Sequence, residues 1–178
     1  MRYLFLKPPV LDRFVYAPFH HSLGKHVRRW GIACLLLIAS AVQFQAHFGF
    51  GLNASPSLPQ RLFLIHKGEL PQRGDYAAFR WPGGGPYPAG VTFVKIVAGM
   101  AGDTVARADH DFFVNGTYVG QAKIVSREGV PLEPGPTGVL PAGRYYVRAP
   151  HPDSLDSRYR LTGWVSEEQI IGRAYALF

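Results

Sequence analysis

An uncharged stretch near the N-terminus constrains this chain more than any other feature of its sequence. Residues 31–50 contain no Asp, Glu, Lys or Arg, and the run GIACLLLIASAV that opens the stretch at Gly31 is almost wholly apolar. Its length matches the ~20 residues that a helix needs to cross a hydrocarbon core of about 30 Å. Arg28 and Arg29 lie just before it, and Trp30 stands where an interfacial aromatic residue is common. We predict a single transmembrane anchor at residues 31–50.

Basic side chains are concentrated before this stretch. Residues 1–30 contain six Lys or Arg and one Asp, a net charge of +5, whereas residues 31–178 have a net charge of +2. The positive-inside rule therefore places residues 1–30 in the cytoplasm and residues 51–178 across the membrane. A nucleic-acid-binding domain would hold its positive charge on the folded part. The lipid bilayer is thus an expected partner, and nucleic acid is not.

Three other interpretations of the apolar stretch stay open. The first is a cleaved secretory signal with Ala39-Ser40-Ala41 as its small-residue site, although thirty residues before the apolar run is long for such a signal. The second is a buried helix of the folded domain, because the strictly apolar part is only about twelve residues long. The third is a helix that lies in the membrane interface.

The rest of the chain is predicted to be mainly β, an antiparallel sheet or barrel with two lobes. The chain has 20 Gly and 15 Pro, which argues against a helical bundle. Asn115-Gly116 between two apolar runs is typical of a type I′ hairpin, and the Gly- and Pro-rich segments 81–90 and 130–142 are expected loops. The expected strands are Arg61–His66, Asp75–Arg80, Val91–Ala98, Thr104–Ala108, Asp111–Val114, Thr117–Val119, Arg144–Ala149 and Ile170–Ala176.

Lys95 occupies an unusual place inside the apolar run Val91–Ala98. Strand alternation puts Lys95 on one face with Phe93 and Val97, and the other face is apolar as well, so we expect burial on both sides. Burial disfavours the ammonium form and lowers the pKa of a lysine, and a neutral lysine can act as a general base. The alternative is a lysine on an edge strand with its ammonium in water.

Two further segments carry side chains that could work with such a base. The segment Asn53-Ala54-Ser55-Pro56-Ser57-Leu58-Pro59 follows the apolar stretch, and its prolines fix the backbone around Ser57. A serine hydroxyl becomes a good nucleophile when a base takes its proton. The segment Ser154-Leu155-Asp156-Ser157-Arg158-Tyr159 places an acid and a base two residues apart. Taken singly, these segments also fit a linker and a surface turn with a weak ion pair.

Together, and in this order, the three segments resemble the type I signal peptidase superfamily. The pattern is Asn-x-Ser-x-Ser-x-Pro, then a lysine in an apolar strand followed by Gly-x-x-Gly-Asp, then Ser-x-Asp-Ser-Arg-Tyr. Ile171-Gly172-Arg173-Ala174 matches the closing segment, and the resemblance covers about residues 49–178. The Ser57-Leu58-Pro59 box and the single N-terminal anchor are similar to TraF-type conjugal-transfer peptidases, which mature pilin subunits.

The resemblance implies a Ser–Lys dyad, a variant of the serine-nucleophile arrangement. Ser57 would be the nucleophile, and Lys95 would deprotonate it and later protonate the leaving amine. The oxyanion would be held by the backbone N–H of Ser57 and by the hydroxyl of Ser55.

The same resemblance gives roles to three residues of the last segment. Ser154 would orient the Lys95 amine, while Asp156 and Arg158 would support the site, with Asp156 either catalytic or structural. The family pattern has a glycine where this chain has Arg61 and a proline where it has Ala101. These departures leave every catalytic group in place.

The implied partner is a protein substrate, a secretory or pilin-like precursor that binds as an extended strand with small residues at the first and third positions before the scissile bond. We expect cleavage at the outer face of a bacterial inner membrane, with the catalytic domain in the periplasm. The TraF resemblance implies a conjugative pilin precursor, with cyclisation if an amine resolves the acyl-enzyme.

No cofactor and no metal are expected. The single cysteine, Cys34, excludes a multi-cysteine zinc site, and the adjacent His20 and His21 have no acid or cysteine ligand near them in the sequence.

Two alternatives to the membrane-anchored peptidase stay open. One is a non-enzymatic anchored component of a conjugation or secretion apparatus, motivated by Arg61 and Ala101. The other is a self-cleaving repressor-type peptidase, which would be soluble and would need a helix-turn-helix pattern that this sequence lacks.

Overall fold

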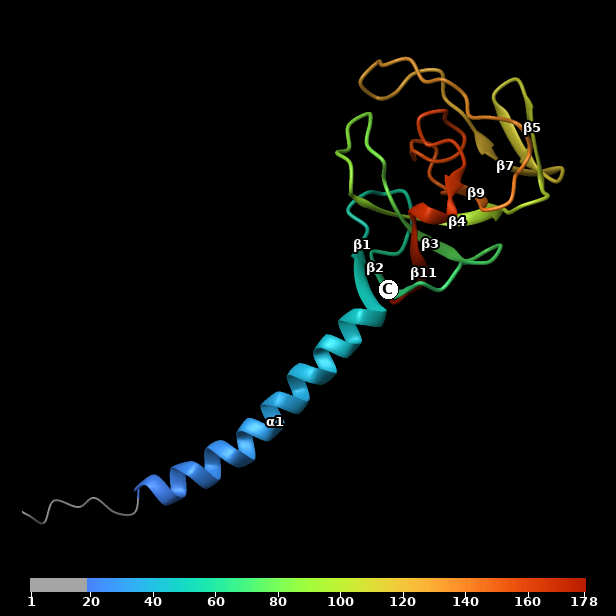
Figure 1. Ribbon diagram of the computed structural model, residues 1–178. Coiled ribbons are helices and arrows are strands. Elements are labelled where there is room, and N and C mark those ends of the chain that lie inside the picture. Colours follow the sequence, from blue (N-terminus) through green and yellow to red (C-terminus); the bar gives the residue numbers. More distant parts are fainter. Residues whose placement is uncertain (1–18) are drawn as a thin grey trace, which may run out of the picture. The chain divides into compact units, whose positions relative to one another are not determined.

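The structure, a computed structural model, describes residues 19–178 (Figure 1), so the first eighteen residues of the expected basic segment lie outside the described residues. The chain divides into two units, residues 1–44 and 45–178. The one helix longer than a single turn in the described part, α1, runs from Phe19 to His47. Its part Val27–His47 is long and apolar enough to cross a membrane by length and composition, as some signal sequences also are.

The apolar helix does not extend over the whole stretch expected to be the anchor. It ends at His47, and residues 48–50 begin strand β1 (Phe48–Leu52) instead. The sequence FGFGL explains this change, because aromatic residues favour strands and two glycines disfavour a helix. None of the apolar window is buried.

The second unit is built from two antiparallel sheets, which confirms the predicted mainly β fold. The larger sheet has, in spatial order, β1, β2 (Leu62–Lys67), β11 (Ile170–Ala176), β3 (Tyr76–Arg80), β4 (Thr92–Gly99), β9 (Arg144–Arg148) and β10 (Val165–Ser166). The smaller sheet has β7 (Thr117–Gln121), β6 (Asp111–Val114), β5 (Thr104–Ala108) and β8 (Gly138–Val139). A short 3-10 helix, Glu167–Gln169, separates β10 from β11.

All eight expected strands are present, with ends within two residues of the prediction. Three strands were not predicted: β1, which lies in the stretch assigned to the anchor, and the two-residue strands β8 and β10. The Asn115-Gly116 turn is confirmed, because both residues have positive φ, 48° and 77°, as a type I′ hairpin requires.

Strand β11 closes the large sheet in its middle although it comes last in the chain. It pairs with β2 on one side and β3 on the other, and its register shifts at Gly172. A Cβ atom at Gly172 would lie 1.9 Å from the carbonyl oxygen of His66, so no larger residue fits there. This close approach gives a physical reason for the glycine in the closing segment.

Strand β4 lies between β3 and β9, in the interior of the larger sheet. Phe93 and Val97 pack in a core cluster with Trp81, whereas Val94 and Ile96 pack on a different cluster that contains Leu58. The prediction of a strand covered on both faces is therefore confirmed. The alternative of an edge strand with an exposed lysine is wrong.

Candidate active site

The segment with Ser57 forms a closed loop between two paired strands. Strands β1 and β2 pair antiparallel up to Leu52 and Leu62, and the backbone N–H of Asn53 donates to the Arg61 carbonyl at 2.8 Å. Leu58 is buried in the core below the loop, which fixes the loop to the domain. Ser57 itself is only 5% exposed although the neighbouring prolines face solvent.

The departure at Arg61 does not disturb this loop. Among the residues that the structure describes, the only non-glycine positions with positive φ are Asp109 and Asn115. The backbone at Arg61 therefore adopts an ordinary conformation that needs no glycine. Its N–H donates to the carbonyl of the C-terminal residue, Phe178, at 2.9 Å.

Two hydroxyls face each other within the loop. The Oγ atoms of Ser55 and Ser57 lie 2.9 Å apart, and Ser55 Oγ also donates to Asn53 Oδ1 at 3.0 Å. Within residues 19–178, the backbone N–H of Ser57 donates to no acceptor. A free N–H beside a second hydroxyl is the arrangement that can hold a developing oxyanion.

Lys95 lies near the middle of β4 and is 5% exposed. Its Nζ atom donates to Ser154 Oγ at 2.8 Å and lies 5.6 Å from the ring centroid of Phe93. Burial lowers the pKa of Lys95 to about 8, an effect that Asp156 opposes and Arg158 adds to. At that pKa about a tenth of the amine is neutral at pH 7, far more than for an exposed lysine.

Asp156 and Arg158 form a buried ion pair behind the pocket. Arg158 Nε and Nη2 each donate to one carboxylate oxygen of Asp156 at 2.8 Å, and both residues are at most 2% exposed. The carboxylate also accepts from the Ala149 N–H at 2.9 Å, and Arg158 Nη1 donates to the Gln121 carbonyl at 3.0 Å. The pair thereby ties the segment that carries Ser154 to the residue just after β9 and to the end of β7.

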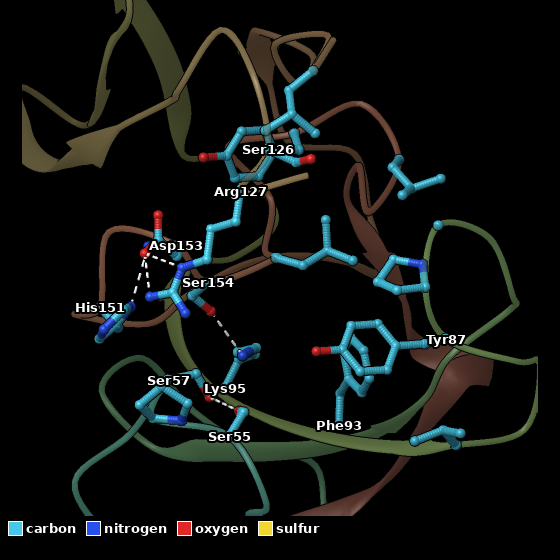
Figure 2. Close-up of a pocket in the computed structure, with 18 of the residues that line it drawn as sticks. Ser55, Ser57, Tyr87, Phe93, Lys95, Ser126, Arg127, His151, Asp153 and Ser154 are labelled. Carbon is cyan, nitrogen blue, oxygen red and sulfur yellow. Dashed lines mark hydrogen bonds and ion pairs between the residues drawn. The ribbon is translucent and has the colours of Figure 1, made fainter. Parts of the chain in front are cut away.

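One pocket brings the predicted catalytic residues together (Figure 2). Ser55, Ser57, Lys95 and Ser154 all line a pocket of about 1270 Å³, which is larger than most small-molecule sites and suits an extended peptide. Asp156 and Arg158 are not among its lining residues. In the described part of the chain, Ser57 bonds to Ser55 and Lys95 to Ser154, and no hydrogen bond joins Ser57 to Lys95. Such bonds are often long without substrate.

Two walls of this pocket were not predicted from the sequence. Tyr87, from the Gly- and Pro-rich loop, packs edge-on against Phe93 beside Lys95 (Figure 2). On another side, Lys123 and Arg127 form ion pairs with Asp153, the residue before Ser154. The second wall joins Lys123 and Arg127 to a residue 30 and 26 positions away, and no local pattern in the sequence signals such a contact.

Among the described residues, no group of three or more His, Cys, Asp or Glu side chains could hold a metal ion. The pocket chemistry is that of hydroxyl, amine and backbone groups. Its groups can supply a nucleophile, a base and donors for a negative oxygen.

Comparisons with known proteins agree with the sequence motifs. The sequence profile described as "Signal peptidase, peptidase S26" matches residues 23–178. A signal peptidase I of Pseudomonas aeruginosa is 29% identical over 95% of this chain and 66% of its own length. A signal peptidase I of Bacillus amyloliquefaciens is 29% identical over 84% of this chain and 83% of its own length. The chain thus spans slightly under two thirds of the Pseudomonas relative.

Among solved structures, a signal peptidase I of Enterococcus faecalis is similar to part of this chain. The match has 25% sequence identity and a TM-score of 0.39, and it covers 59% of this chain and 97% of the other.

Proposed function

We propose that this chain, which belongs to the signal peptidase family (peptidase S26), is a membrane-anchored serine endopeptidase that uses a Ser57–Lys95 dyad. The single observation that carries the proposal is the state of Lys95. Its amine is buried, has a lowered pKa and bonds to Ser154 at the edge of the pocket that also holds Ser57. A buried amine with no carboxylate bonded to it is well suited to accept a proton.

The acylation step follows from these groups. Ser57 Oγ attacks the scissile carbonyl carbon while its proton moves to the neutral Nζ of Lys95. The carbonyl oxygen becomes an oxyanion, held by the Ser57 N–H and the Ser55 hydroxyl. When the C–N bond breaks, the Lys95 ammonium returns its proton to the departing amine. The product is an ester between Ser57 and the upstream peptide.

Deacylation uses the same residues in the reverse sense. Lys95 removes a proton from a water molecule, which attacks the ester carbonyl carbon. The Lys95 ammonium then returns this proton to Ser57 Oγ as the C–O bond breaks, which releases the peptide acid and regenerates the Ser57 hydroxyl. An amine can take the place of the water and would then form a new peptide bond. We propose that hydrolysis is the basal reaction. The TraF resemblance suggests cyclisation of a pilin as a second way to resolve the same acyl-enzyme.

The expected topology suits substrates that are themselves inserted in a membrane. We propose residues 1–30 as a cytoplasmic segment, residues 31–50 as the anchor region and residues 51–178 as a periplasmic peptidase domain of a bacterial inner membrane. Ser57 follows the end of helix α1 by ten residues, so a scissile bond close to the outer membrane surface is within reach. We propose a conjugative pilin precursor as substrate, bound as an extended strand.

Precursor processing in membranes tests this proposal. Membranes that contain the wild type, Ser57→Ala or Lys95→Ala are compared for cleavage of a pilin precursor and of a secretory precursor. Ser166→Ala is the matched control, because it removes a serine hydroxyl outside the pocket. We expect both dyad variants to accumulate uncut precursor while the control cuts normally.

The outcome also separates the other candidates. If the dyad variants and the wild type process equally, the peptidase proposal fails and a non-enzymatic assembly component is favoured. Cleavage of the secretory precursor alone would retain the peptidase and reject the pilin substrate. Cleavage of the chain itself, in a soluble fraction, would favour a self-cleaving peptidase.

A further inference from the structure

The side chain of Asn53 is the centre of the loop that carries Ser57. Its Nδ2 group donates to the carbonyls of Leu58 and Gln60, both at 3.1 Å. Its Oδ1 atom accepts from the backbone N–H of Ser55 at 3.2 Å and from Ser55 Oγ at 3.0 Å. One amide therefore uses both of its donors and accepts two further bonds, all within a loop of eight residues.

The surroundings determine which way this amide points. A rotation by 180° would turn Oδ1 toward two carbonyl oxygens and Nδ2 toward the Ser55 N–H. Both new contacts would be repulsive, so the observed orientation is the only one that these neighbours allow. Asn53 Oδ1 is thus fixed as an acceptor that faces Ser55.

The fixed acceptor determines how the hydroxyl protons are shared. An amide oxygen cannot donate, so the bond between Asn53 and Ser55 uses the single proton of the Ser55 hydroxyl. The 2.9 Å contact between Ser55 and Ser57 must then use the proton of Ser57. Without substrate, the Ser57 proton is accordingly directed at Ser55 rather than at Lys95.

We propose that Asn53 is a positioning residue that holds the Ser55 oxygen where it can meet the oxyanion, a role that rests on the proposed Ser57–Lys95 chemistry. Before substrate binds, the bond to Asn53 holds the Ser55 oxygen in one rotamer, and a rotation about the Cβ–Oγ bond exchanges this bond for another without moving the oxygen. When the oxyanion forms, the Ser55 proton turns from Asn53 to it, and Ser57 gives its own proton to Lys95. The donor is thus in place before the reaction begins.

A double-mutant cycle tests this role, with kcat and KM measured separately. The probe is an internally quenched peptide with alanine at the first and third positions before its scissile bond, cleaved by the full chain in detergent. The variants are Asn53→Ala, Ser55→Ala, the double variant and Ser57→Ala. Gln60→Ala is the matched control, because this residue is in the same loop but its side chain bonds to Tyr76 instead of Ser55.

We expect Asn53→Ala to lower kcat about 10- to 100-fold and to change KM less than about threefold, since an oxyanion donor acts mainly in the transition state. In the Ser55→Ala background the same change is expected to lower kcat less than about threefold. Gln60→Ala is expected to stay near the wild-type kcat. The thermal midpoint of each variant shows whether it is folded.

Three results would overturn the inference. An equal loss of kcat in both backgrounds would mean that Asn53 only holds the loop together, and no loss in either would mean that it is dispensable. Equal turnover by the wild type and Ser57→Ala would reject the proposed dyad and this role with it. If Asn53→Ala does not fold, Asn53→Ser replaces it in the same cycle, because it keeps a small uncharged polar side chain.

Discussion

The amine of Lys95 donates to the hydroxyl of Ser154 at 2.8 Å, and both side chains are at least 95% buried. The two residues are 59 positions apart in the sequence, on β4 and on the loop after β9. A neutral acceptor next to a buried amine orients the amine without adding a negative charge. This arrangement keeps the pKa of Lys95 low, whereas a bonded carboxylate would raise it.

The pH dependence of the rate is the first prediction. Burial lowers the pKa of Lys95 to about 8, and only the neutral amine can accept a proton. We expect kcat/KM to rise about tenfold between pH 7 and pH 9, with a midpoint near 8. The measurement is a pH–rate profile over the range in which the circular dichroism spectrum is constant. A flat profile, or a midpoint near 10.4, would contradict the assignment of Lys95 as base.

The same lowered pKa predicts a cost in stability. At pH 7 the folded protein must hold a mostly protonated amine in a buried site, whereas the unfolded chain holds it in water. We expect Lys95→Met to abolish activity and to raise the free energy of unfolding at pH 7 by about 1–3 kcal/mol, after allowing for the lost bond to Ser154. Urea denaturation measures the difference.

The stability cost of burying Lys95 depends on pH. Between the folded pKa near 8 and the unfolded value near 10.4, the unfolded wild type binds more protons, so its stability rises with pH. The advantage of Lys95→Met should therefore shrink as the pH rises through this window. An advantage that stays constant up to pH 10.5 would contradict the prediction.

A third prediction concerns the ion pairs at the rim of the pocket. Asp153 bonds to Lys123 and Arg127, and these bonds lower the pKa of its carboxyl. These ion pairs attach the segment that contains Lys123 and Arg127 to Asp153, which directly precedes Ser154. We expect Asp153→Ala to lower kcat/KM about three- to tenfold with little change in stability, because the pairs are partly exposed.

Salt provides the control for this third prediction. Screening weakens exposed ion pairs, so 1 M NaCl should lower kcat/KM of the wild type more than that of Asp153→Ala. The measurement is kcat/KM of both proteins at low and high salt. If the two proteins respond equally to salt, the ion pairs do not hold this wall of the pocket.

Much of the fold could be predicted because local patterns determine it. Short apolar runs separated by Gly and Pro predicted eight of the eleven strands in the described residues, and the Asn115-Gly116 pair predicted the hairpin between β6 and β7. The burial of Lys95 also followed from the apolar residues on both faces of its strand. The roles of Ser57, Lys95 and Ser154 came from the family resemblance, and they stay predictions until the variants are assayed.

The rest depends on contacts that leave no local pattern. Strands β8 and β10 have two residues each, too few to show alternation, and they exist only through their partners β5 and β9. The Lys123–Asp153 pair joins residues 30 positions apart. The contacts of Asn53 depend on how the loop folds back on itself, so its sequence position alone could not reveal them.

The last prediction compares two ion pairs of the same chemistry in opposite surroundings. Asp156 is fully buried and bonds to Arg158 twice, whereas Glu133 and Arg160 form a pair with side chains at least 70% exposed. Removing one partner of a buried pair leaves an uncompensated charge, so we expect Asp156→Ala to lower the free energy of unfolding by about 3–5 kcal/mol. The matched Glu133→Ala should change it by less than about 1 kcal/mol. Denaturant titration at pH 7 measures both, and similar losses in the two variants would mean that the Asp156–Arg158 pair does not hold this segment in place.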